Sequence, residues 1–125
     1  MAKLSRDDET ARIETMPGFE GRYTESDGYT IGLEKFAEGA DMTPYFAGLP
    51  DDQCQSPHWG YVITGRLTYH RTEGDEVFNA GDAYYVAPGH TPEVAAGTEI
   101  VEFSPEEALA RTMEVVTRNF QADTD

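Results

Sequence analysis

Three side chains of this sequence belong to the types that bind transition metals. Cys54 and His58 lie close together in "CQSPHWG", and His90 lies in "APGHTPE". A cysteine thiolate and neutral imidazoles are good ligands for zinc, iron or copper, and three protein ligands leave a position open for water or a substrate. That arrangement is typical of a catalytic metal. The spacing Cys-x-x-x-His is a weak signal by itself, because no second short pair completes a structural zinc site.

Each of these residues also has an interpretation without a metal. Cys54 could be a small buried hydrophobic residue, since free cysteine is among the most buried residue types. His58 could form hydrogen bonds inside a polar pocket, where Gly60 and Val62 on the same strand face would leave space beside it. His90 stands in a turn, where a histidine can equally well lie at the surface. Both interpretations stay open at this point.

Short strands are the elements expected to position these residues. The segments "GRYTES" and "GYTIGLEKF" are rich in aromatic and β-branched residues, and Asp27-Gly28 between them suits a tight turn, which predicts a β-hairpin. In residues 29–34, apolar and polar or small residues alternate, as in a strand with one solvent-facing side. Further strands follow residue 57, separated by turn signals at 65–66, 73–75, 80–82 and 88–89. This pattern favours an all-β barrel or sandwich.

The last predicted element has a different periodicity. In "SPEEALARTMEVVTRNF", residues 104–120, apolar residues recur at three- and four-residue steps, which predicts an amphipathic helix. Ser104 as the cap, Pro105 at the first position and Glu107 as the capping-box residue specify its start. We expect this helix to pack across the outside of the barrel or on a partner. The predicted organisation is a flexible segment 1–12, a barrel 13–103, the helix 104–120 and a flexible tail 121–125.

Composition restricts the partners and the compartment. The chain has 125 residues, which suits one domain, and its 24 acidic and 9 basic residues give a net charge of -15. Such a charge repels phosphate backbones and anionic lipids, so we expect neither nucleic acid nor a membrane as a partner. The single cysteine cannot form an internal disulfide, and the amino terminus has no apolar stretch, which together favour a cytoplasmic location. No phosphate-binding loop, nucleotide-binding glycine fingerprint or nucleophile elbow is present.

Two segments of the chain are similar to a known pair of motifs. "GYVITGRL" matches the end of a motif in which two histidines and a glutamate precede a strand-ending glycine, and "GDAYYVAPGHTPEV" has the length and punctuation of its companion. On these segments, and on "VEFSP" after them, the span from about Gln53 to Pro105 resembles the cupin superfamily. The resemblance implies a small all-β double-stranded β-helix, or jelly-roll barrel, with the C-terminal helix appended.

The metal-ligand positions of the resemblance are substituted. His58 stands where the family usually has its glutamate, Cys54 stands near the second histidine, and Asp52 stands near the first. In the second motif Pro92 holds the usual histidine position and His90 lies two residues earlier. The resemblance implies a divalent transition metal (zinc, iron, manganese or copper) and dioxygenase, isomerase or lyase chemistry on a small organic molecule. It equally allows a metal-free ligand-binding or regulatory cupin, because a fold does not choose a function.

Four further residues are candidates for the pocket. Asp52 could add a ligand or orient one. Tyr84 and Tyr85 point to opposite faces of a strand, so one of them is expected to line the pocket. Glu102 could serve as an acid, a base or an extra ligand, although its apolar neighbours argue that it points outward.

One strand face is unusually rich in large apolar residues. Trp59, Tyr61 and Ile63 lie opposite His58 and need cover from a second sheet or a second subunit. We expect core packing, with a homodimer interface as the alternative. His70 is expected to be exposed or to face a dimer partner, because Leu67 and Tyr69 should point inward. A protein with only a structural role and a vestigial pocket is the third hypothesis.

Overall fold

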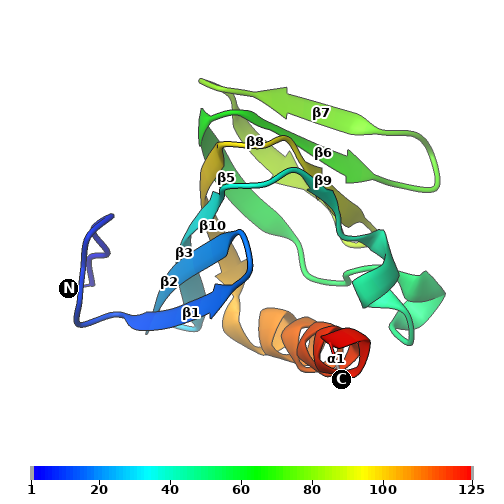
Figure 1. Ribbon diagram of the computed structural model, residues 1–125, viewed down its shortest axis with the longest axis horizontal. Coiled ribbons are helices and arrows are strands. Elements are labelled where there is room, and N and C mark those ends of the chain that lie inside the picture. Colours follow the sequence, from blue (N-terminus) through cyan, green and yellow to red (C-terminus); the bar gives the residue numbers. More distant parts are fainter. Residues whose placement is uncertain (1, 125) are drawn as a thin grey trace.

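The structure is a computed structural model that describes residues 2–124. Within these residues the chain forms strands, two short 3-10 helices and one long helix (Figure 1). The elements in chain order are β1 (Arg12–Met16), β2 (Phe19–Ser26), β3 (Tyr29–Phe36), β4 (Ala40–Asp41), η1 (Thr43–Phe46), η2 (Pro50–Asp52), β5 (His58–Thr64), β6 (Arg66–His70), β7 (Glu76–Asn79), β8 (Ala83–Val86), β9 (Thr91–Val94), β10 (Thr98–Pro105) and α1 (Glu106–Thr124).

The strands form two antiparallel sheets that share one core. The larger sheet has the order β1-β2-β3-β10-β5-β8, and the smaller has the order β4-β9-β6-β7. The main hydrophobic cluster takes residues from both sheets: Phe36, Val62, Leu67, Tyr69, Tyr84, Val86, Val94 and Ile100. The predicted all-β jelly-roll barrel with a C-terminal helix is therefore confirmed.

The predicted hairpin is present as β2 and β3. Ser26 pairs with Tyr29 across the turn, and the two turn residues have positive φ, 52° for Asp27 and 82° for Gly28. A two-residue hairpin turn with both centres in this region matches the right-handed twist of the strands, and aspartate followed by glycine tolerates it. The turn sequence therefore sets the register of the whole hairpin.

The inner face of the larger sheet is polar near one end. In β3, Thr30 and Gly32 are buried, whereas Tyr29 is 45% exposed. The alternation was predicted, but the polar side faces the barrel and the aromatic side faces solvent. A polar interior is tolerated only where its groups are hydrogen-bonded, so this end of the barrel is a candidate for a site.

The helix α1 closes the open end of the barrel next to this polar region (Figure 1). It begins at Glu106, because β10 continues through Pro105, and it extends to Thr124, beyond the predicted end at residue 120. Its Val116 is buried with Phe46 and Cys54, and the Asn119 side chain donates to one backbone carbonyl in η1 and to another just after it. The helix thus covers the interior instead of an outer face. Residues 1 and 125 of the predicted flexible ends lie outside the described residues.

Over residues 2–124, no helix combines the length and the apolar character needed to cross a lipid bilayer.

Candidate metal site

A backbone bridge brings two distant candidate residues together. The Cys54 amide donates to the His90 carbonyl at 2.8 Å, and the Gly89 amide donates to the Cys54 carbonyl at 2.7 Å. This isolated antiparallel bridge joins the loop after η2 to the turn before β9. Cys54 and His90 are 2% and 0% exposed, so the turn histidine is inside the protein and not at its surface.

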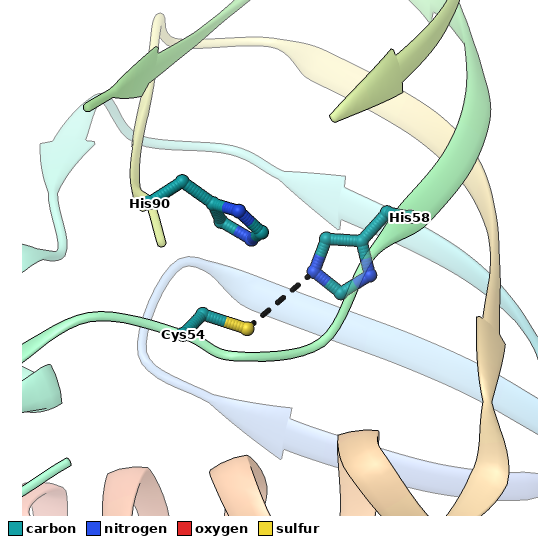
Figure 2. Close-up of side chains that lie close together, drawn as sticks. All are labelled: Cys54, His58 and His90. Atoms are coloured by element: carbon teal, nitrogen blue, oxygen red, sulfur yellow. Dashed lines mark hydrogen bonds between the residues drawn. The ribbon is translucent and has the colours of Figure 1, made fainter. Parts of the chain in front are cut away.

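His58 completes a cluster of three ligand-type side chains. It is the first residue of β5 and is buried, and its Nε2 lies 3.7 Å from Cys54 Sγ. One ligand atom from each of Cys54, His58 and His90 lies within 4.8 Å of the others. Figure 2 shows the two imidazoles and the thiol directed toward a common point. The three residues that the sequence singled out are therefore together, within reach of a single ion after small adjustments.

The hydrogen bond of His90 determines which nitrogen is free. Its Nδ1 lies 2.7 Å from the Ala87 carbonyl, and a carbonyl oxygen can only accept, so Nδ1 carries the proton. The other nitrogen, Nε2, is buried and has no hydrogen-bond partner among residues 2–124. An unpaired lone pair on a buried imidazole costs free energy unless a ligand uses it. This atom is the strongest indication of a metal in the cluster.

His58 is oriented by a strand of the same sheet. Its Nδ1 lies 2.7 Å from the Ser104 hydroxyl on β10, and a proton on Nδ1 leaves the lone pair of Nε2 facing Cys54. A partner on the far nitrogen is the usual way in which a ligating histidine is held. Burial lowers the pKa of His58 to about 4, and burial together with His58 lowers the pKa of His90 to about 3. Both imidazoles are therefore neutral at pH 7, as metal ligands must be.

The thiol of Cys54 is protonated in the metal-free protein. Burial raises its pKa to about 11. The sulfur lies 3.6 Å from the Thr112 hydroxyl on α1 and 3.8 Å from the Ser56 carbonyl. A cation would lower this pKa, since a thiol that coordinates a metal loses its proton. Ser104 was expected to cap the helix, yet its hydroxyl contacts His58, and Thr112 of the helix contacts Cys54.

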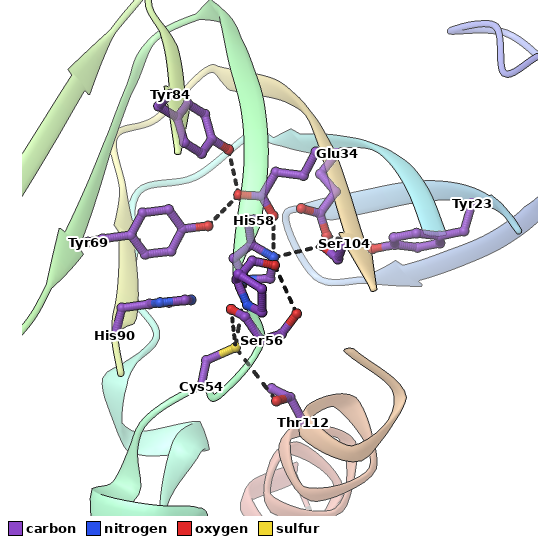
Figure 3. A network of polar contacts seen from close by, with 12 residues as sticks. Tyr23, Glu34, Cys54, Ser56, His58, Tyr69, Tyr84, His90, Ser104 and Thr112 are labelled. Carbon is purple, nitrogen blue, oxygen red and sulfur yellow. Dashed lines mark hydrogen bonds and ion pairs between the residues drawn. The ribbon is translucent and has the colours of Figure 1, made fainter. Parts of the chain in front are cut away.

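Glu102 points into the barrel, which corrects the outward orientation expected from its neighbours. It accepts hydrogen bonds from the hydroxyls of Tyr69 and Tyr84, and its other oxygen lies 3.8 Å from His58 Nδ1. Its apolar neighbour Phe103 is 41% exposed, so the side of the strand that carries Phe103 is the outer one. Burial raises the pKa of Glu102. Figure 3 shows the two tyrosine hydroxyls directed toward the centre of this network.

A second carboxylate, Glu34 on β3, was not identified from the sequence. The Tyr23 hydroxyl donates to it at 2.6 Å, and burial followed by the charge of Glu102 raises its pKa to about 7. Gly32 makes room for this arrangement, because a Cβ there would lie 3.0 Å from the Tyr23 ring. A glycine and a glutamate at alternate positions of one strand, Gly32 and Glu34, are a signal that could have been used.

Of the three remaining candidates, the structure places one inside the barrel and two outside it. Tyr84 faces the interior and is 7% exposed, whereas Tyr85 faces outward and is 49% exposed. Asp52 is exposed in η2 and accepts a hydrogen bond from the Gly48 amide at 2.9 Å, so it does not join the cluster. No regular strand runs through this region, because η2 and an extended loop carry the chain from residue 50 to residue 57.

The aromatic face opposite His58 is not core. Trp59 and Tyr61 are each 43% exposed, so packing against a second sheet of the same chain is excluded as their role. They belong to a group of exposed aromatic residues on the outside of the larger sheet: Tyr29, Trp59, Tyr61, Tyr85 and Phe103. His70, as predicted, lies near the surface while Leu67 and Tyr69 are buried.

Comparisons with known proteins identify the fold. No family model and no curated protein sequence matches this chain. Among solved structures, an RmlC-like cupin from Shewanella frigidimarina is 19% identical, with a TM-score of 0.56, 83% of this chain covered and 92% of that one. KdgF from Halomonas sp. is 25% identical, with a TM-score of 0.52 and coverage of 75% and 86%.

A longer protein contains the same fold as a part. Oxalate decarboxylase from Lactobacillus farciminis, in a formate complex, is 18% identical with a TM-score of 0.58, and the match covers 85% of this chain but 34% of that one. The two antiparallel sheets and the C-terminal helix of this chain agree with its similarity to these solved structures. The chain therefore has the fold of a small cupin.

Proposed function

We propose that this protein binds one divalent transition metal through Cys54, His58 and His90 and uses it in chemistry on a small organic molecule. The observation that carries the proposal is the buried lone pair of His90 Nε2, which has no partner among residues 2–124. It faces a thiol and a second imidazole, with all three ligand atoms within 4.8 Å. Two imidazoles and one thiolate suit zinc, iron or copper, and the open coordination position suits a substrate.

The residues around the cluster have separate tasks in this proposal. Ser104 and the Ala87 carbonyl fix the two imidazoles from behind, each at 2.7 Å. Glu102 lies on the inner wall, where Tyr69 and Tyr84 hold one of its oxygens and leave the other free to accept a proton from a bound molecule. A metal held there supplies Lewis-acid activation of a substrate oxygen or of water.

Elemental analysis tests the proposal directly. The protein is purified without added metal or an affinity tag, then reconstituted separately with iron, manganese, zinc and copper. We expect about one equivalent of bound metal per chain. Alanine variants of Cys54, His58 and His90, made singly, should each lose most of it, because each removes one of three ligands.

His70→Ala is the matched control, since it removes a histidine outside the cluster. It should retain the metal content of the wild type. Circular dichroism of every variant separates loss of metal from loss of fold. Bound metal far below one equivalent after reconstitution, or retention in all three folded alanine variants, would contradict the proposal.

A metal-free ligand-binding or regulatory cupin is the second candidate. It is favoured by the contacts that Cys54 makes without an ion, to His58 at 3.7 Å and to Thr112 at 3.6 Å. In that case the wild type remains metal-free in the elemental analysis and still binds a small molecule in the pocket.

We propose in addition that the exposed aromatic face joins two copies of the chain. Trp59 packs against Tyr85 and Tyr29, with ring centroids 5.1 and 6.4 Å apart, and these residues carry no charge in a chain of net charge -15. An uncharged aromatic patch lets two acidic copies approach without like-charge repulsion. Sedimentation should give a dimer for the wild type and a monomer for Trp59→Asp, and a folded wild-type monomer would refute the interface.

The expected absence of nucleic-acid and membrane partners and the cytoplasmic location remain predictions from charge and from cysteine content.

A further inference from the structure

A second cavity adjoins the metal cluster. The space that contains Cys54, His58 and His90 has a volume of about 90 Å³. A larger cavity of about 300 Å³ lies between β2, β3, β10 and the start of α1. The two cavities share Glu34, Glu102, Leu109 and Met113 as walls. A molecule in the larger cavity would therefore extend past Glu34 and Glu102 toward the cluster.

The wall of the larger cavity is strongly acidic. It contains the carboxylates of Glu14, Glu25, Glu34, Glu102 and Glu106 and the single cation Arg12. Arg12 is already paired, with Glu14 at 3.0 Å and with Glu25 at 2.8 Å. The wall therefore has no free cationic side chain to pair with the two inner carboxylates.

The two inner carboxylates have hydrogen bonds but no cationic side chain beside them. Glu34 is held by Tyr23, and Glu102 by Tyr69 and Tyr84. Over residues 2–124, neither forms an ion pair with a lysine or an arginine, and the side chain of Glu102 is only 12% exposed. Placing two carboxylates together in a protein interior is costly unless a positive charge or a proton offsets them.

We propose that the larger cavity binds a small organic cation, an amine or an amidine, whose charged group lies between Glu34 and Glu102. The inference rests on the proposed function, because the unpaired His90 Nε2 lines the smaller cavity, which shares Glu34 and Glu102 with the larger one, and is the independent sign that a ligand enters this part of the barrel. The cation anchors the molecule, and its neutral part reaches the Cys54–His58–His90 cluster. An anionic ligand would face like charge on both sides.

Three molecules of the same shape and different charge test this proposal: benzamidine, benzamide and benzoate. Binding is measured by calorimetry and by chemical-shift changes at about 0.15 M ionic strength, which screens the distant surface charges. Benzamidine is protonated at neutral pH, and it should bind at least about tenfold more tightly than benzamide, the gain typical of a hydrogen bond to a charged group. Benzoate should bind least.

Two glutamine variants locate the effect. Glu34→Gln keeps the shape and the acceptor for Tyr23, and it should reduce the preference for benzamidine over benzamide to about threefold or less. Glu107→Gln removes the same charge from an exposed position on α1, and it should keep the full preference.

The metal content of the same proteins keeps the two proposals distinguishable. Glu34→Gln should retain metal and lose the preference for the cation, whereas His90→Ala should lose metal and retain that preference. Equal binding of benzamide and benzamidine by the wild type would overturn the cation proposal, as would an unchanged preference in folded Glu34→Gln. Neither result would alter the conclusion drawn from metal content.

Discussion

Two groups of ligand-type side chains in this protein both contain histidine but lie in opposite environments. Cys54, His58 and His90 are buried at the inner end of the pocket. Asp41, His70 and Glu93 lie at the edge of the smaller sheet, also with ligand atoms within 4.8 Å of one another, but with the two carboxylates exposed. His70 donates to Asp75 at 2.8 Å and to Glu93 at 2.7 Å.

The two groups differ in the hydrogen-bond partners of their histidine nitrogens. In the surface group both nitrogens of His70 have carboxylate partners, and the hydrogen bond to Asp75 is the main cause of its raised pKa. In the buried group the pKa values of His58 and His90 are lowered, chiefly by burial. A protonated histidine between carboxylates has a hydrogen-bond partner for each nitrogen and needs no ligand, whereas a neutral buried histidine with a free lone pair still lacks one partner. Proximity of ligand-type residues alone therefore does not identify a metal site.

The largest expected effect is on metal affinity. Cys54→Ser should weaken binding by at least about 100-fold, since it replaces a ligand in the cluster. Asp41→Asn and Glu93→Gln, combined in one variant, should change the affinity by less than about twofold. Competition with a chromogenic chelator measures both. A surface variant that loses metal while Cys54→Ser retains it would reverse the comparison.

An intermediate effect is expected on stability in acid. In the metal-free protein the pKa of His90 is about 3, below its unfolded value of 6.5, so its neutral form stabilises the fold above pH 6.5 and this stability is lost as the pH falls. Between these values the loss should be about 1.4 kcal/mol per pH unit. Urea unfolding with a chelator present, compared between wild type and His90→Gln from pH 7 to pH 4, measures it. Parallel curves for the two proteins would contradict the buried neutral state.

The smallest effect is expected at His70, with the opposite sign. Its pKa is raised by its carboxylate partners, so its contribution is complete below about pH 6.5 and is lost as the pH rises through the folded value. Because its partners are exposed, the contribution should be about 0.2 to 1 kcal/mol. His70→Gln should therefore destabilise at pH 5.5 and be nearly neutral at pH 9, and greater destabilisation at pH 9 would show that the carboxylates do not hold a proton on His70.

Much of the architecture could be predicted from local patterns. Asp27-Gly28 indicated the hairpin of β2 and β3, and the turn signals separated the later strands as observed. The periodicity of residues 104–120 indicated α1, although Pro105 lies in β10 instead of the first helical turn. Such features depend on neighbouring residues, which a sequence displays directly.

The direction of the strand faces could not be predicted in the same way. Alternation in β3 and β10 separates two sides, but it does not say which side meets the other sheet. The polar sides face inward, where tyrosine hydroxyls form hydrogen bonds with Glu34 and Glu102. These contacts cannot be seen in the sequence, so Glu102 was expected to point outward and Glu34 was missed. A rule that places apolar residues inside fails where a polar network fills the interior.

By itself, the sequence determined the barrel, the helix and the residue types available for a site, because these follow from local patterns of side chains and turns. Only the tertiary structure decided that Cys54 and His90 meet across a backbone bridge and that Asp52 stays outside. It also decided that α1 closes the pocket with Thr112 against the cluster. These outcomes depend on contacts between residues far apart in the chain, and they are settled by the packing of the two sheets and the helix around one shared interior.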